Sequence, residues 1–597
     1  MRLPDGVVRV SCAAVVTFVP PTWLAVAACF WTGCATPVKP RPGLEGESAA
    51  FVRTHFEQRP GEAVALGWHE HDGRIVVPTR EAMNRELSRL RSFEVSLRGV
   101  REAGLSDSAR LDLQLLRLAV RRGLWSLETE QGWRRNPMFY AGALDVSLYI
   151  RRDFKPLRER VADMASILRH APGLFAAARA NLDLVLPRPF VETGIEVARG
   201  TAAFLEREVL HAARTCGDPR VLAEFEAANS GAARECRAFA AWLEAERLPA
   251  SNGAFALGRE GYVAMLRAEG VEGSPEEILA AGLRELAAEQ SRFGAAAREI
   301  DATRPAAAVF KAIQRDHPTA SSLIPDTRRN LEVIREFVVS RRLVTIPSEV
   351  RARVEATLPP FRATSFASMD TPGPFETRAT EAYYYVTPVE PGWSEGQAEE
   401  WLSAFNYYTT DVVSIHEAYP GHYVQFLALN ASRATTVQKV FPSYAFSEGW
   451  AHYAEQMVLE AGFMQPPDPA RCTAEERVRA AKYRLAQSDE ALLRLCRLCC
   501  SVRMHCDGMT VDEATAFFRE QCHYEEKPAR SEATRGTYDP GYLFYTLGKM
   551  QILALRDEAR RALGDRFDLG RFHDELLAHG APPPALLRPF VTRRQRD

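Results

Sequence analysis

The sequence lacks an excess of charge of either sign, because 75 lysine and arginine residues are balanced by 77 aspartate and glutamate residues. It shows no basic stripe, so we expect no nucleic-acid partner. Beyond the first 34 residues it contains no run of the ~20 apolar residues that a membrane-spanning helix needs. Glycine and proline, with 37 residues each, are too scarce for a collagen or a low-complexity chain. A globular protein remains, and a hydrophobic content of 46% is ordinary for that class.

Residues 1–34 have the pattern of an export signal. Two arginines precede a mostly apolar stretch over residues 10–31, which a proline pair interrupts and no stop-transfer charge follows. The tetrad Thr-Gly-Cys-Ala around Cys34 is similar to a bacterial lipobox, although Trp31 is unusual before it, and Cys29 is a second candidate. An uncleaved anchor or a wrongly placed start codon would give a similar pattern. We expect export to the cell envelope, facing the periplasm, with a lipid on Cys34 as the contact with the membrane.

Eleven cysteines raise the question of pairing, and eight of them lie beyond the leader. In an oxidising compartment some should form disulfides. Cys216 and Cys236 flank a turn and a predicted helix, so a disulfide between them is one expectation. Cys496, Cys499 and Cys500 fall at i, i+3 and i+4 of a helical stretch. A zinc cluster there is an alternative, but small buried side chains on one helix face are the more common arrangement.

Apolar periodicity predicts helices over most of the chain. From about residue 45 to 370, leucine, alanine and phenylalanine recur at i, i+3, i+4 and i+7. Ser274 with Glu277, and Thr510 with Glu513, have the spacing of capping boxes at helix starts. The length allows roughly three to five small domains or one large two-lobed domain. We therefore expect a mainly α-helical fold, with the periodic helices as a packed scaffold.

Residues 358–393 break the helical pattern. Six prolines interrupt this segment, and between them lies the β-prone stretch 382–387, with three consecutive tyrosines. The pattern predicts a short sheet or a lone strand just before the residues that carry the chemistry. Helical periodicity resumes at about Ser394.

The segment from His416 to His422 has the residue types of a zinc site. Two histidines bracket Glu417; imidazole is a good zinc ligand, and an adjacent glutamate can act as a general base toward water. Positions i and i+6 diverge by about 120° on a straight helix, so a regular helix cannot present both imidazoles to one ion. Pro420 and Gly421 lie where the correction is needed. We predict that the helix bulges there and turns His422 back toward His416.

A third ligand is expected from the segment 447–455. Glu448, His452 and Glu455 would face the same side of one helix. Glu448 is the preferred ligand because it lies nearest the loop that returns from His422, and the other two remain alternatives. With Glu448 as the ligand, His452 or Glu455 would orient a ligand imidazole from behind.

Three segments together resemble the bacterial family called domain of unknown function 885: HEAYPGH at 416–422, SEGWAHYAE at 447–455 and RGTYDPGYLFYTLGK at 535–549. The family itself resembles helical zinc peptidases of the gluzincin type, such as the thimet-oligopeptidase and angiotensin-converting-enzyme groups. The resemblance extends over about residues 45–590. It implies a two-lobed, zincin-like helical fold with the small sheet near a cleft. An N-terminal helical lobe would cover 35–370, and a catalytic lobe would cover 371–597.

The resemblance also implies roles for individual residues. His416, His422 and Glu448 would bind one Zn²⁺ ion per chain, and Glu417 would activate water. Helical zinc peptidases of this type stabilise the oxyanion with a tyrosine or histidine. Tyr545 is the candidate here.

Tyr538 and Tyr542 are alternatives to Tyr545 as the oxyanion donor. Arg535 could hold a substrate carboxylate through two parallel hydrogen bonds.

Two further features have weaker functional interpretations. The strand around Tyr385 could bind substrate by pairing with an extended peptide, although packing of its aromatic residues explains the same pattern. His69 and His71 bracket Glu70 at i and i+2, which favours a loop or strand over a helical metal site.

Together with this resemblance, the sequence predicts a zinc-dependent peptidase that hydrolyses short peptides outside the cytoplasm. One alternative is a metallohydrolase that acts on a non-peptide amide or ester. Another is a membrane-tethered binding lipoprotein without turnover. Glu417 argues against the last, because a site that only binds a metal needs no base beside its ligand.

Overall fold

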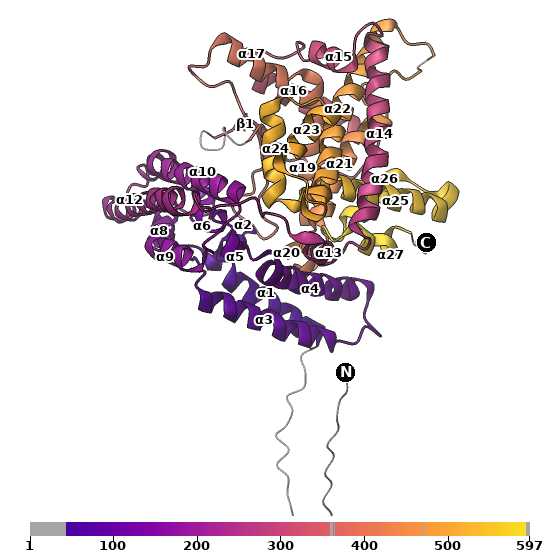
Figure 1. Cartoon of the computed structure of the whole chain (residues 1–597). Coiled ribbons are helices and arrows are strands. Elements are labelled where there is room, and N and C mark those ends of the chain that lie inside the picture. Colours follow the sequence, from indigo (N-terminus) through magenta and orange to yellow (C-terminus); the bar gives the residue numbers. More distant parts are fainter. Residues whose placement is uncertain (1–42, 359–361, 363–364, 469, 593–597) are drawn as a thin grey trace, which may run out of the picture. The chain divides into compact units, whose positions relative to one another are not determined.

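A computed structural model describes residues 43–358, 362, 365–468 and 470–592 (Figure 1). The predicted export signal, with Cys29 and Cys34, lies outside these residues. The helices that precede the sheet are α1 (Leu44–Gln58), α2 (Pro60–Ala65), η1 (His69–His71), α3 (Arg80–Arg98), α4 (Asp107–Trp125), η2 (Ser126–Glu130), α5 (Gly132–Arg135), α6 (Met138–Ala141), α7 (Ser147–Arg151), α8 (Leu157–Leu168), α9 (Ala171–Asn181), α10 (Arg188–Phe204), η3 (Leu205–Val209), α11 (Leu210–Ala213), α12 (Pro219–Trp242), η4 (Leu243–Arg247), α13 (Gly258–Ala268), α14 (Pro275–Ile300), α15 (Ala306–Ile313) and α16 (Leu323–Ser340).

A second series of helices follows the sheet and carries the predicted site. These are α17 (Glu395–Ala404), α18 (Tyr407–Glu417), α19 (His422–Ala431), α20 (Thr436–Val440), α21 (Tyr444–Glu460), α22 (Ala474–Cys506), α23 (Val511–Cys522), α24 (Glu526–Tyr538), η6 (Pro540–Leu543), α25 (Phe544–Leu563), η7 (Gly564–Arg566), α26 (Leu569–Leu577), η8 (Pro584–Leu587) and α27 (Arg588–Val591). The prediction of a mainly helical fold is confirmed. Both predicted capping boxes form, at Ser274 before α14 and at Thr510 before α23.

A three-stranded sheet interrupts the helices; it includes the predicted stretch 382–387 but begins at residue 353, where the apolar pattern predicted helix. It consists of β1 (Arg353–Ala356), β2 (Ala367–Asp370) and β3 (Tyr383–Val386), in the order β1-β3-β2. β3 pairs in parallel with β1 and antiparallel with β2 along its whole length. The central strand therefore has no open edge, and one edge of β2 faces α18 instead.

The long helix α22 organises the part of the chain that holds the site. It packs along α14 and also contacts α18, α23, α24 and α25 (Figure 1). Its 33 residues are buried on most sides, as expected for a helix that is enclosed by others. Cys496, Cys499 and Cys500 are fully buried in its apolar surroundings, which agrees with the interpretation of small core residues.

The first helices of the chain pack against a segment that belongs to the site region. Val437, Val440 and Phe441, in and just after α20, join the apolar cluster of α1, α3 and α4. Residues from Gly43 onward form one compact unit, and the division into two lobes at residue 370 stays a prediction. Among the described residues, none of the helices combines the length and apolar character that crossing a membrane would require.

The expected disulfide between Cys216 and Cys236 is not formed, and both residues are thiols. Cys236 is fully buried on α12. The Cys216 Sγ lies 3.6 Å from the carbonyl oxygen of Asp218, in the loop before that helix. A turn between two cysteines therefore did not bring their side chains together.

Candidate metal centre

A break between two helices brings the two histidines together. α18 ends at Glu417 and α19 begins at His422, so the deformation is a complete break rather than the predicted bulge. The Gly421 N–H donates to the Ile415 carbonyl at 3.0 Å, which folds the turn back onto α18. A Cβ at Gly421 would lie 1.7 Å from the His416 carbonyl oxygen, so no other residue fits there.

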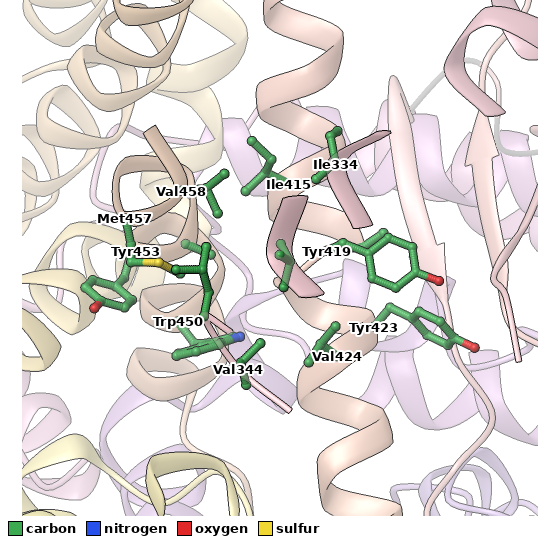
Figure 2. Packing of buried hydrophobic residues seen from close by; sticks show 14 of the residues in the cluster. Ile334, Val344, Ile415, Tyr419, Tyr423, Val424, Trp450, Tyr453, Met457 and Val458 are labelled. Atoms are coloured by element: carbon green, nitrogen blue, oxygen red, sulfur yellow. The ribbon is translucent and has the colours of Figure 1, made fainter. Parts of the chain in front are cut away.

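Trp450 holds this turn from the neighbouring helix α21. Its indole N–H donates to the carbonyl of Pro420 at 2.9 Å and reaches that of Gly421 at 3.3 Å. Figure 2 shows the ring in the same apolar cluster as Val344 and Val424, and the side chain is fully buried. The second sequence motif therefore secures the backbone of the first.

A close crossing of α21 and α25 sets the position of the third acidic residue. The two helices meet at Gly449 and Gly548; a Cβ on Gly548 would lie 1.8 Å from the Ala445 carbonyl oxygen. This contact between backbones brings two neighbours of the glycines to the same place. They are Glu448 on α21 and Tyr545 on α25, one helical turn before Gly548.

His416, His422 and Glu448 converge, with potential ligand atoms all within 4.8 Å of one another. The Glu448 Oε2 lies 3.5 Å from the His416 Nε2 and 3.6 Å from the His422 Nε2. Ligands of a tetrahedral zinc ion with bonds of 2.0–2.1 Å are separated by about 3.4 Å. The Glu448 Oε2 is buried without a hydrogen-bond partner in the described part of the chain. A buried carboxylate oxygen needs such a partner or a cation, so the donor set fits a zinc ion.

Electrostatics within this group favour a cation. Burial alone would lower the pKa of His416, but Glu448 and Glu455 outweigh it and raise the pKa to about 9. Burial would raise the pKa of Glu448, but His416 and His422 hold it well below its ordinary value. The site therefore draws a positive charge between its ligands, which a metal ion can supply.

Glu455 orients the first histidine from behind. Its Oε1 lies 2.7 Å from the His416 Nδ1 and its Oε2 lies 3.0 Å from the His452 Nδ1. A carboxylate can only accept, so both Nδ1 atoms carry protons. The His416 Nε2 is then the nitrogen that faces Glu448, and its lone pair becomes available when His416 loses its second proton. The structure thus places both alternative ligands in an outer layer, with His452 acting through Glu455.

Glu417 lies beside the ligands but faces the sheet. Its Oε2 accepts the backbone N–H of Met369 in β2 at 2.9 Å. That N–H points away from β3, so the open edge of β2 and the candidate base lie side by side. Met369 carried no signal in the sequence, because only its backbone takes part.

Tyr545 lies next to the ligand group among positive charges. Its ring is 6.5 Å from the His416 ring and nearly parallel to it. The guanidinium carbons of Arg494 and Arg497, on α22, are 5.8 and 5.3 Å from the Tyr545 ring centroid. Burial and then Glu448 raise the pKa of Tyr545. Sequence reasoning missed both arginines, since nothing distinguishes them from their neighbours on a long helix.

Arg535, Tyr538 and Tyr542 have other partners or surroundings, which weakens their predicted roles in substrate binding and oxyanion stabilisation. Arg535 Nε and Nη2 both donate to the Asp539 Oδ2, at 3.0 and 2.8 Å. The predicted grip on a substrate carboxylate would require this pair to open. Tyr542 is fully buried, and the Tyr538 ring lies 6.4 Å from Phe190.

Peptide pairing at Tyr385 is excluded, because β1 and β2 occupy both edges of β3. Tyr385 is also mostly buried, with 8% of its surface exposed. Its predicted role in substrate binding therefore loses the physical basis on which it rested, and the open edge of β2 is the remaining place for an extended chain.

His69 and His71 do not form a metal site with Glu70. The His69 ring lies between Asp72 and Glu376, with contacts of 3.0 and 2.9 Å. Across the described residues, His416, His422 and Glu448 are the one group of three metal-ligating side chains that converge.

Comparison with known proteins gives a family and a fold. The chain belongs to the family described as "Bacterial protein of unknown function (DUF885)", whose model matches residues 60–591. It is similar in structure to a candidate lipoprotein of unknown function from Shewanella oneidensis, with 22% identity, a TM-score of 0.75, and coverage of 92% of this chain and 100% of that one.

A candidate lipoprotein from Colwellia psychrerythraea is also similar, with 17% identity, a TM-score of 0.74, and coverage of 92% and 99%. No curated protein matches the sequence. These likenesses concern the fold alone.

Proposed function

We propose that this protein is a zinc-dependent peptidase that hydrolyses short peptides at the cell envelope. The observation that carries the proposal is the convergence of one ligand atom each from His416, His422 and Glu448 within 4.8 Å of one another. Glu417 stands next to the first ligand in the chain. The resemblance of these motifs to gluzincin peptidases, with a two-lobed zincin-like fold, supports the same conclusion.

The chain's own groups would divide the work as follows. His416, His422 and Glu448 would hold Zn²⁺, which when bound supplies a Lewis acid for the carbonyl group. Glu455 would keep the His416 imidazole in the required tautomer.

Glu417 would take a proton from water and pass it to the leaving amine. Its Oε2 is held by the Met369 N–H, so its Oε1 is the oxygen that remains for proton transfer. Tyr545 would donate a hydrogen bond to the oxyanion. Its raised pKa keeps the phenol protonated and able to donate.

The substrate class follows from exposure and from the sheet. The side chains of His416, Glu448 and His422 are 6%, 19% and 24% exposed, so the site is recessed. A recessed site favours a thin, extended chain over a folded protein. The open edge of β2 beside Glu417 offers backbone groups with which such a chain could pair.

The proposed location rests on the leader and on the similar structures. Residues 1–34 have the pattern of an export signal with a lipobox at Cys34. The proteins from Shewanella oneidensis and Colwellia psychrerythraea are both described as candidate lipoproteins. Membrane contact would then be through a lipid on Cys34, with the folded part facing the periplasm.

The test combines metal analysis with three variants. We expect about one zinc ion per chain in the wild type and in Glu417→Gln, and none in His422→Ala. Hydrolysis of blocked peptides should fall by orders of magnitude in Glu417→Gln, because the base is lost while the metal stays. Glu400→Gln, which changes an exposed glutamate on α17, is the matched control and should keep full activity.

A panel that includes esters and non-peptide amides separates the alternatives. Turnover of those compounds without turnover of peptides would favour a metallohydrolase of another substrate class. A zinc-loaded wild type that turns over nothing would overturn the enzymatic proposal in favour of a binding lipoprotein.

A further inference from the structure

We propose that Arg494 is a positioning residue that couples the metal ligand His416 to Tyr545; this inference rests on the proposed function. Arg494 lies on α22, a helix that contacts α18, α21 and α25. It is 7% exposed. A guanidinium in such a place must be held by partners, and two of its partners, Glu455 and Tyr545, belong to the candidate site.

One side of the guanidinium contacts the carboxylate that orients His416. The Arg494 Nη2 lies 3.3 Å from the Glu455 Oε1, the same oxygen that accepts from the His416 Nδ1. Within the described residues, Arg494 is the one arginine or lysine within 4.0 Å of this buried carboxylate. Without it, the Glu455 Oε1 would lose its cationic partner and would be held by the His416 Nδ1 alone.

The other contact is with the candidate oxyanion donor. The Arg494 guanidinium carbon lies 5.8 Å from the Tyr545 ring centroid, within the range of a cation–π contact. Its Nη1 donates to the carbonyl oxygen of Glu490 at 2.9 Å and also to the Glu490 carboxylate, one turn back on α22. The guanidinium is therefore fixed to α22 while it touches groups from α21 and α25.

Arg497 provides an internal comparison, because it shares only one of these contacts. Its guanidinium carbon lies 5.3 Å from the Tyr545 ring, and its Nε and Nη2 both bond to Glu532 at 2.8 Å. It makes no ion pair with Glu455 among the described residues. Arg494 should thus influence both metal binding and turnover, and Arg497 should influence turnover alone.

The experiment measures zinc affinity by chelator competition on the purified full chain. Arg494→Met should weaken zinc binding by roughly 10–100-fold, the usual range for a residue that supports a ligand from behind. Arg497→Met should stay within about twofold of the wild type. Arg556→Met is the control, since Arg556 is equally buried but pairs with Glu460 away from the site.

Two backgrounds identify the route of the effect. In Glu455→Gln, adding Arg494→Met should weaken zinc binding no further, because the link is already cut. In Tyr545→Phe, neither arginine variant should lower kcat further, whereas in the wild type each should lower kcat by ~10-fold or more with KM nearly unchanged.

Several outcomes would overturn the inference. They are wild-type zinc affinity in Arg494→Met, an equal loss in Arg556→Met, or an undiminished loss in the Glu455→Gln background. If Arg494→Met does not fold, Arg494→Lys carries the comparison, because lysine keeps the charge but cannot bridge Glu455 and Glu490 at once. A chain that binds zinc as expected but hydrolyses nothing would refute the proposed function. The zinc affinities of the variants would still test the role of Arg494 in zinc binding.

Discussion

At the scale of single residues, the candidate ligands depend on partners that differ in kind. His416 is held through its second nitrogen by Glu455. Glu448 has a buried oxygen that contacts the two imidazoles at 3.5 and 3.6 Å, beyond hydrogen-bonding distance. His422 depends on the shape of the turn before it. Zinc binding should therefore be sensitive to charge at one ligand and to backbone geometry at another.

The raised pKa of His416 predicts how zinc affinity changes with pH. With a pKa of about 9 in the zinc-free chain, His416 must lose a proton when zinc binds at lower pH. The zinc dissociation constant should fall by ~10-fold per pH unit from about pH 7 to 9 and level off above. Chelator competition at each pH measures this.

Glu455→Gln is the matching variant for this pH series, because it keeps the three candidate ligands and removes a carboxylate that raises the pKa of His416. In this variant the pKa of His416 is lower, so the pH range over which the zinc dissociation constant falls should move to lower pH. The stability of the zinc-free chain should also depend on pH. The raised pKa of His416 stabilises the folded state fully below pH ~6.5, and that stabilisation is lost as the pH rises toward 9. A dissociation constant that does not change between pH 7 and 9 would contradict the assignment.

Asp411 gives a prediction of the opposite kind, on the same helix as His416. Burial raises its pKa to about 6, and hydrogen bonds from Tyr483 and Asn330 offset only part of that effect. The pKa of Asp411 is higher in the folded state than in the unfolded state. The stability that protonated Asp411 contributes is therefore complete below pH ~4 and is lost as the pH rises through 6.

We expect Asp411→Asn to gain stability relative to the wild type from pH 4 to 6, by at most about 3 kcal/mol, and to keep that gain above pH 6. Urea unfolding of both proteins from pH 4 to 8 measures the difference. Parallel curves over the whole range would mean that Asp411 is as well solvated in the folded chain as in the unfolded one.

At the scale of elements, the site depends on two helix contacts that only glycine permits. Gly421 allows the break between α18 and α19, and Gly548 allows α25 to touch α21. Both contacts act between backbones, so they fix where whole helices lie. The positions of the candidate ligands follow from that placement.

Gly548→Ala should therefore destabilise the protein by at least ~2 kcal/mol, because its methyl group would overlap the Ala445 carbonyl. It should also weaken zinc binding, since Glu448 lies beside the contact. Gly200→Ala is the control: this glycine is on α10 with open space around it. It should gain ~0.5–1 kcal/mol from the better helix propensity of alanine.

Denaturant midpoints and zinc affinity of the two glycine variants test this directly. Equal effects of both changes would show that helix propensity, not the close crossing of α21 and α25, decides the outcome.

The elements also show which features could be predicted from the sequence. Helices and capping boxes depend on neighbours in the chain, so periodicity and the Ser274 and Thr510 signals were sufficient. The residue types around His416 and Glu448 indicated the candidate ligands for the same reason. Sheet order depends on pairing between distant segments, which is why Tyr385 was expected at an open edge and lies on the central strand.

Contacts between helices were equally hidden in the sequence. Arg494 and Arg497 read as ordinary residues of α22, and only the packing of α21 and α25 against it gives them a role. The prediction for Cys216 and Cys236 was wrong for a related reason. Their spacing in the chain indicated proximity, but the fold does not bring them into a disulfide.

At the scale of the whole molecule, zinc should act as a link between distant parts of the chain. Its candidate ligands lie on α18, α19 and α21, and each of these helices contributes to the same apolar cluster. A ligand that binds only the folded state stabilises it in proportion to the logarithm of its concentration.

We expect free zinc at ~100 times its dissociation constant to stabilise the wild type by about 2.7 kcal/mol, and a chelator to reverse the gain. Thermal unfolding with and without zinc measures it. His422→Ala should show no dependence on zinc, and a shift of equal size in that variant would place the ion elsewhere.

The hydrogen bond between the Met369 N–H and Glu417 couples the edge of the sheet to the candidate base. An extended chain that added to the open edge of β2 would meet an amide already engaged by the carboxylate. If it took that amide for itself, Glu417 would be released to turn toward the newcomer. Arrival of a partner and readiness of the proton acceptor would then be a single event.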